Sequence, residues 1–231
     1  APVQADRVLA VLSKMCNWQA ARSDEYVSPV VRGMRRSDPN ASKRTRILDD
    51  REIALLWKAS ANQPIFGKFV RFALLTGQRR SKVQMLDWSQ IDEDGLWHLP
   101  YQKKEKPNAE RLPLPDFALN VLGKDWRQFN QGLVFTEDGL KPINGFSKCK
   151  ARLDADMAAM ADIPISPWVI HDLRRTAKSM MAKCGVARDI SERVLGHTIA
   201  GVEGVYDQYD YVLEKRVALE KLSAAISVIV H

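Results

Sequence analysis

The chain has little of what marks several special classes of protein. Only three of its 231 residues are cysteine (Cys16, Cys149 and Cys184), and no two of them form a C-x-x-C pair. Three widely spaced thiols argue against a disulfide framework and against a zinc site, and they indicate a reducing compartment. No apolar run approaches the roughly 18 residues of a membrane span, and the first residues show no signal-peptide pattern. We therefore expect a cytoplasmic protein that is not attached to a membrane.

Patterns for metal and nucleotide chemistry are missing too. The chain has four histidines but no H-E-x-x-H pair, which is a common zinc-hydrolase arrangement. It also has no Gly-rich P-loop sequence, which cradles nucleotide phosphates in many ATPases. The sequence thus predicts no metal and no cofactor.

What the chain does have is an ordinary globular composition with an excess of positive charge. Hydrophobic residues make up 45% of it and charged residues 27%, as in soluble globular domains. Lysine and arginine outnumber aspartate and glutamate by 35 to 28, a net charge of +7. Such an excess favours a polyanionic partner such as nucleic acid, although many soluble proteins are equally basic without one. The length allows one large domain, or one domain with part of another.

Composition divides the chain into a short first piece and a main domain. Hydrophobic periodicity predicts a helix over residues 5–22. The stretch 34–46 is polar and basic and contains proline and asparagine, which is typical of a linker. We therefore predict a helical piece at 1–36, a linker at 37–46 and a main domain at 47–231.

The main domain is predicted to be mainly helical with a small antiparallel sheet. Asp49 and Glu52 resemble a capping box at the start of a first helix. Asp94-Gly95 predicts a hairpin turn between strands at 88–91 and 96–99, and 111–114 predicts a further short strand. The remaining predicted helices lie at 64–75, 79–87, 116–122, 144–160, 168–183, 188–195 and 210–228.

Four separate stretches hold side chains suited to phosphate chemistry. Together they supply two guanidiniums, two imidazoles and a phenol, the groups that a covalent attack on a phosphodiester requires. Ser166-Pro167 predicts the start of the helix that carries the second stretch, so its histidine and arginine share one face near the positive helix end. The stretches are TGQRR at 76–80, HDLRR at 171–175, LGH at 195–197, and Tyr206, which lies nine positions after His197.

Each of these residues also has an ordinary interpretation when it is taken singly. The arginines of the first two stretches could be surface charges, with Arg80 competing with Arg79 for any role. The histidines could cap or pack. Tyr206 is one of three nearby tyrosines, with Tyr209 and Tyr211, and tyrosine is usually a half-buried packing residue.

Taken together and in this order, the stretches resemble the tyrosine recombinases, or phage-type integrases. The resemblance extends over nearly the whole chain and is closest to integrases of prophages and genomic islands. It rests on HDLRRTA at 171–177, LGHT at 195–198 and VYDQYDYVLEKRVALEKL at 205–222. It implies a mainly α-helical α+β catalytic domain with a small antiparallel β-sheet. Residues 1–36 would then be the last helices of a truncated core-binding domain.

The resemblance also implies roles for individual residues. Arg79 and Arg174 would be the two active-site arginines that meet the charge on the phosphate. His171 and His197 would be the two active-site histidines, with His171 assisting proton transfer. Tyr206 would be the nucleophile, because the family places it about nine residues after the Gly-His pair.

Two lysine positions complete this comparison. The family carries a lysine on a β-hairpin, which would act as the acid to the leaving oxygen, and Lys106 fits it best, with Lys103 and Lys104 as alternatives. Three residues after the first arginine the family usually has an acid, but here Lys82 stands there. That departure puts full catalytic strength in doubt, but not the family.

The function implied is a site-specific DNA recombinase that integrates or excises a mobile element through a 3′-phosphotyrosine intermediate. One ester replaces another in each step, so no ATP is needed. The expected partners are double-stranded DNA attachment sites, further copies of the chain in a homotetramer, and accessory DNA-bending or excision factors. The alternatives are a type IB topoisomerase, a catalytically weakened DNA-binding accessory protein, and a helical protein whose basic surface serves another purpose. The apolar stripe of 210–228 packs either in cis or on a neighbouring subunit.

Overall fold

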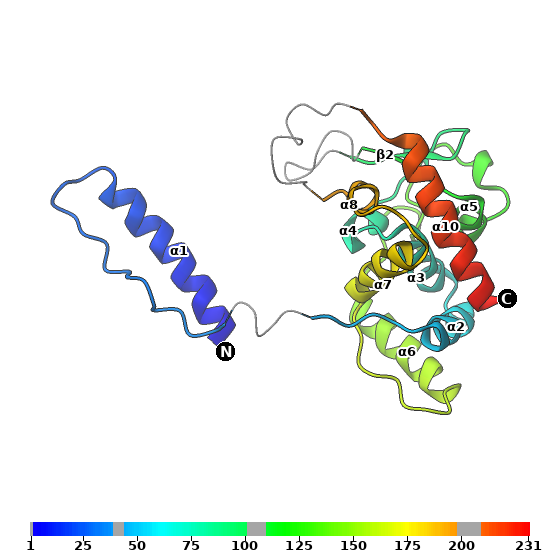
Figure 1. Ribbon diagram of the computed structural model, residues 1–231, viewed down its shortest axis with the longest axis horizontal. Helices are drawn as coiled ribbons and strands as arrows, with labels where there is room; N and C mark the ends of the chain where they lie inside the picture. The colour runs from blue at the N-terminus through cyan, green and yellow to red at the C-terminus, as the bar shows by residue number, and fades with distance from the viewer. Residues whose placement is uncertain (1, 39–43, 101–109, 198–208) are drawn as a thin grey trace. The chain divides into compact units, whose positions relative to one another are not determined.

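The computed structural model describes residues 2–38, 44–100, 110–197 and 209–231 (Figure 1). It forms two compact units, Ala1–Thr45 and Arg46–His231. Within the described residues, none of the helices is long and apolar enough to cross a membrane.

The first unit is one helix with a returning segment. α1 spans Pro2–Ala20, so the helix predicted at 5–22 forms, with both ends shifted by two or three residues. The buried carboxylate of Asp6 accepts hydrogen bonds from the backbone N–H groups of Arg36 (2.9 Å) and Ser37 (2.8 Å). This contact ties the returning segment to the helix.

Helices make up most of the second unit (Figure 1). The predicted capping box is confirmed, because Asp49 accepts from the N–H of Glu52 and Glu52 accepts from the N–H of Asp49. The expectation of a mainly helical fold with a small sheet is confirmed as well. The helices are α2 (Asp50–Ala59), α3 (Pro64–Thr76), α4 (Arg80–Gln84), α5 (Asp116–Leu122), α6 (Phe146–Ala159), α7 (Ile170–Lys183), α8 (Arg188–Leu195) and α10 (Val212–Val230).

The core is built around α3. This helix packs against α5, α7 and α10, and it is buried on nearly all sides, as its run of apolar residues requires. Phe69 and Phe72 are fully buried and meet Phe135 at ring distances of 5.6 and 5.8 Å. The end of α3, where the TGQRR stretch at 76–80 begins, is therefore held in the core.

The small sheet forms, but not from the strands expected on both sides of Asp94-Gly95. β1 (Leu96–His98) pairs antiparallel with β2 (Arg111–Pro113). The prediction of a strand at 88–91 is wrong, because Trp88–Gln90 forms a 3-10 helix. Asp87 causes this, since its carboxylate accepts the N–H of Ser89 at 2.9 Å and so caps a helical turn.

Two helix boundaries also differ from the prediction. The helix expected from Ser166-Pro167 begins only at Ile170, because the buried carboxylate of Asp172 accepts the N–H of Val169 at 2.9 Å and caps the helix there. The helix expected at 79–87 is shorter, since α4 ends at Gln84.

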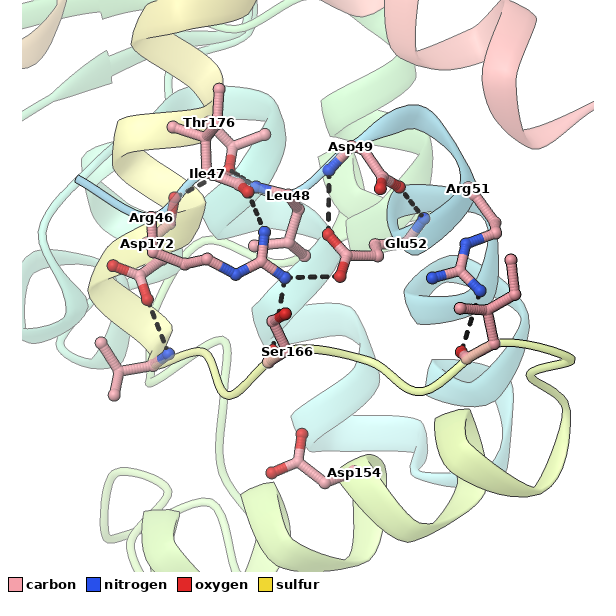
Figure 2. A network of polar contacts seen from close by, with 12 residues as sticks. Arg46, Ile47, Leu48, Asp49, Arg51, Glu52, Asp154, Ser166, Asp172 and Thr176 are labelled. Carbon is pink, nitrogen blue, oxygen red and sulfur yellow. Dashed lines mark hydrogen bonds and ion pairs between the residues drawn. The ribbon is translucent and has the colours of Figure 1, made fainter. Parts of the chain in front are cut away.

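The first residues of this unit are tied to α7 by a network of polar contacts (Figure 2). Arg46 donates to the carboxylate of Glu52 and to the carbonyl of Ser166. The N–H of Leu48 donates to the hydroxyl of Thr176 at 2.9 Å, in the middle of α7. The entry of the chain into the unit is therefore fixed against the helix that carries His171 and Arg174.

The last helix packs within its own unit. α10 contacts α2, α7, α8 and β2. Leu219, Leu222 and Ile226 of its apolar stripe are fully buried there.

A glycine lies where the end of α3 meets α7 and α8. Gly77 ends α3 in the left-handed conformation, with φ of +63°. A Cβ atom on it would lie 2.9 Å from Leu195 Cδ2 and 3.3 Å from Ala177 Cβ. Both neighbours are buried.

Replacing Gly77 by alanine is therefore expected to destabilise the protein by roughly 2 kcal/mol or more, the sum of left-handed strain and overpacking. Gly145 is a matched control, because its φ is +64° but a Cβ atom there would meet nothing within 4 Å. Gly145→Ala should cost only about 1 kcal/mol. Denaturant unfolding measures both, and equal losses in the two variants would contradict the close approach at Gly77.

Candidate active site

Arg174 lies at the centre of the candidate site. Its side chain extends from α7 with only 4% of the residue exposed. One guanidinium nitrogen donates to the carbonyl of Gly77 at 2.9 Å, and the other donates to the carbonyl of Leu195 at 2.6 Å. These carbonyls stand at the C-terminal ends of α3 and α8, where helix dipoles concentrate negative charge. Two helix ends thus help to compensate the buried charge.

His197 adjoins this guanidinium. Its Nε2 lies 2.7 Å from an Nη of Arg174, and its Nδ1 is hydrogen-bonded to Glu192. A guanidinium only donates, so Nε2 accepts and the ring proton lies on Nδ1, which donates to Glu192. Burial lowers the pKa of His197, and the charges of Arg174 and Arg79 lower it further against the opposing effect of Glu192. The imidazole is therefore neutral at neutral pH.

Arg79 enters the site from the junction of α3 and α4. It is the N-cap of α4 with an extended backbone. The preceding Gln78 donates to the carbonyl of Val194 at 2.7 Å, which ties this junction to α8. The charge of Arg79 lowers the pKa of both His171 and His197. The guanidinium of Arg79 is thus close enough to both imidazoles to disfavour their protonated forms.

His171 lies at the start of α7, beside a surface pocket of about 440 Å³ that Arg80, Lys150 and Trp168 also line. Partial burial lowers the pKa of His171, and the charges of Arg175, Arg174 and Arg79 contribute in the same direction. The ring is a neutral proton acceptor at neutral pH.

The structure thus brings together four of the six residues that the sequence singled out: Arg79, His171, Arg174 and His197. Lys106, its alternatives Lys103 and Lys104, and Tyr206 lie outside the described residues. Lys82 is described, and its side chain is buried in α4 with 6% exposed.

Glu192 and Lys178 belong to the same site, although the sequence analysis did not single them out. Glu192 accepts from His197 and also from the ammonium of Lys178. The missed signal was Gly196, which ends α8 with φ of +66°. A glycine there predicts a turn in which the next residue bonds back to the helix, and the N–H of His197 does donate to the carbonyl of Glu192 at 2.9 Å.

Comparison with known proteins identifies the family. The family model described as "Phage integrase family" matches residues 46–211. This chain belongs to the phage integrase family. The resemblance to tyrosine recombinases is thereby confirmed, and the matched region includes Arg79, His171, Arg174, His197 and Tyr206.

One curated relative is the integrase of Salmonella phage P22. It is 34% identical over 135 residues, which cover 55% of this chain and 35% of the phage protein. The chain thus matches about a third of the length of that relative.

Two solved structures share the fold. An integrase from mycobacterium phage Brujita aligns with a TM-score of 0.57 at 13% identity, covering 93% of this chain and 70% of the other. A lambda integrase tetramer bound to a Holliday junction aligns with a TM-score of 0.59 at 17% identity, covering 88% of this chain and 60% of the other. At these identities, both comparisons show only that the fold is shared.

The charges around the two histidines predict opposite shifts in two variants. Arg79→Gln removes a cation that lowers the pKa of both rings, so the pKa of His171 and of His197 should rise. Glu192→Gln removes the carboxylate that raises the pKa of His197, so that pKa should fall further. Histidine Cε1–H signals followed by NMR across pH 4–9 measure both.

The signal of His98 in β1 serves as an internal reference, because Nε2 of this ring pairs with Asp92 at 2.9 Å. Unchanged titration of both site histidines in Arg79→Gln would contradict the gathering of these residues.

Proposed function

We propose that this chain is the catalytic part of a site-specific recombinase that cuts and rejoins DNA by transesterification. The observation that carries the proposal is the hydrogen-bonded guanidinium of Arg174, with His197 bonded to it and Arg79 acting on both histidines. Preorganised cations of this kind stabilise the charge that develops on a phosphate under attack. Membership of the phage integrase family supports the same reaction.

In the proposed reaction, Tyr206 is the nucleophile. Its phenolic oxygen attacks the phosphorus, so that a 3′-phosphotyrosine ester forms while the bond from phosphorus to the 5′-oxygen breaks. His171, neutral at neutral pH, accepts the phenolic proton, since a phenol with an ordinary pKa near 10 needs a base. Lys106 donates a proton to the leaving 5′-oxygen. Attack by a 5′-hydroxyl of the partner strand reverses these steps and reseals the DNA.

Arg79 and Arg174 bind the non-bridging oxygens of the phosphate in this proposal. A guanidinium presents paired donors that match two phosphate oxygens. His197 orients Arg174, because its Nε2 accepts a hydrogen bond from the guanidinium. Glu192 fixes the tautomer of that ring.

The other two nearby tyrosines are poorly suited to the attack. Negative charge on Glu214 and Asp210 raises the pKa of Tyr209, which opposes formation of its phenolate. The ring of Tyr211 packs beneath the guanidinium of Arg193 at 3.7 Å. Both observations favour Tyr206 as the nucleophile.

The proposed substrates are double-stranded DNA attachment sites of a mobile element that the protein integrates or excises in the cytoplasm of a host. The net charge of +7 suits such a polyanion. The solved lambda integrase is a tetramer bound to a Holliday junction, which supports a homotetramer on DNA here. Accessory DNA-bending or excision factors are further proposed partners. Residues 1–36 would then contribute the end of a core-binding domain and 37–46 the linker.

A nicked duplex tests this reaction, because the short strand beyond the nick is lost after cleavage and the covalent complex is trapped. The wild-type chain should form an adduct that survives denaturing electrophoresis at low salt. Tyr206→Phe should abolish it, because the attacking oxygen is removed. Tyr209→Phe is the matched control and should keep it.

Cognate duplexes for this assay are obtained by covalent capture from a library of randomised nicked sites. The proposal fails if no adduct forms with any member, or if Tyr206→Phe still forms one. Exchange of strands between two captured duplexes distinguishes a recombinase from a topoisomerase of the same chemistry.

A further inference from the structure

One ion pair joins the two described segments that follow the proposed acid and the proposed nucleophile. Arg111 opens β2, five positions after Lys106, and Asp210 lies four positions after Tyr206. An Nη of Arg111 lies 2.7 Å from an Oδ of Asp210. These residues are 99 positions apart in the sequence.

Both members of the pair are also attached to the first turn of α10. The second oxygen of Asp210 accepts the N–H of Val212 at 3.2 Å. The carbonyl of Arg111 accepts a hydrogen bond from Nζ of Lys215 at 2.5 Å, and Lys215 is fully buried. Because Leu219 of α10 is buried in the core, the Arg111–Asp210 pair is attached to a helix that is itself held in place.

The residue between Asp210 and α10 is held in a strained conformation. Tyr211 has φ of +54°, a left-handed value that no other non-glycine residue in the described part of the chain adopts. Such a conformation persists only where surrounding contacts hold it. The guanidinium of Arg193 lies 3.7 Å from the centre of the Tyr211 ring.

Arg193 follows Glu192 directly in α8, and Glu192 is bonded to His197. Two consecutive residues of α8 therefore contact Tyr211 and His197, which lie on opposite sides of 198–208 in the sequence. The chain is thus fixed at both sides of the stretch that contains Tyr206.

We propose that the Arg111–Asp210 pair is a positioning device that sets the place of the nucleophile relative to the acid, and this inference rests on the proposed function. The pair is half exposed, with 50% and 39% of the two side chains accessible. Exposed pairs contribute only about 0–1 kcal/mol to folding, whereas small misplacements of reacting groups slow catalysis strongly. The pair therefore acts on the cleavage rate more than on stability.

Two neutralising variants separate positioning from simple electrostatics. Arg111→Gln lowers the net charge by one. Asp210→Asn raises it by one while keeping a side-chain oxygen that accepts from the N–H of Val212. Their effects on DNA affinity should be opposite in sign. Both should nevertheless slow covalent complex formation at saturating nicked duplex, by roughly 10-fold.

The double variant tests whether the two residues act as a unit. Arg111→Gln with Asp210→Asn should be no slower than the slower single variant, because the interaction is already lost in each. Arg111→Lys should recover most of the rate. Unfolding midpoints should stay close to that of the wild type.

A second exposed ion pair provides the matched control. Lys183 of α7 lies 3.6 Å from Asp50 of α2, with 75% and 62% of the side chains exposed. Lys183→Gln and Asp50→Asn repeat the same two charge changes, and neither should alter the cleavage rate.

Any of three results would overturn the inference. In the first, Arg111→Gln and Asp210→Asn both cleave within twofold of the wild-type rate. In the second, the two single variants change the cleavage rate in opposite directions, as their net charges do, and in the third the rate losses of the two single variants add in the double variant. In each of these cases the wild-type adduct still forms and still depends on Tyr206, so the proposed function stands. If the wild-type chain forms no adduct, both the proposed function and this inference fail.

Discussion

The buried guanidinium of Arg174 is the constraint on which the site depends. A buried charge is costly unless it is hydrogen-bonded, and here the ends of α3 and α8 supply the acceptors, at Gly77 and Leu195. Both helices must therefore end against α7. This requires a left-handed glycine at Gly77, because a side chain there would collide with Leu195. The packing of α3 and α8 against α7 thus also supplies the hydrogen-bond acceptors for the buried charge of Arg174.

The same guanidinium determines the state of His197. Since it can only donate, the facing nitrogen must accept, and the proton of the ring is directed to Glu192. Burial, together with the surrounding cations, keeps the pKa of both site histidines below its ordinary value. The result is a site rich in positive charge whose imidazoles are neutral, a combination suited to binding a phosphate and accepting a proton beside it.

The sequence predicted those features that local rules govern. The Asp49–Glu52 capping box and the ends of α5 and α8 follow from neighbouring residues, and they form as expected. The predictions failed where a capping carboxylate that the prediction had not considered sets the local structure. Asp172 delays the start of α7, and Asp87 converts a strand-like run into a helical turn. Glu192 was missed because its role arises only when the turn at Gly196 returns the chain to α8.

The identity of the attacking residue is the central claim, and peptide mapping of a trapped adduct tests it most directly. Digestion with trypsin and nuclease should give the peptide 194–215, which contains Tyr206, Tyr209 and Tyr211 together. Fragment masses should place a nucleotide phosphate on Tyr206 alone. A phosphate on Tyr209 or Tyr211, or on any residue outside this peptide, would contradict the site described here.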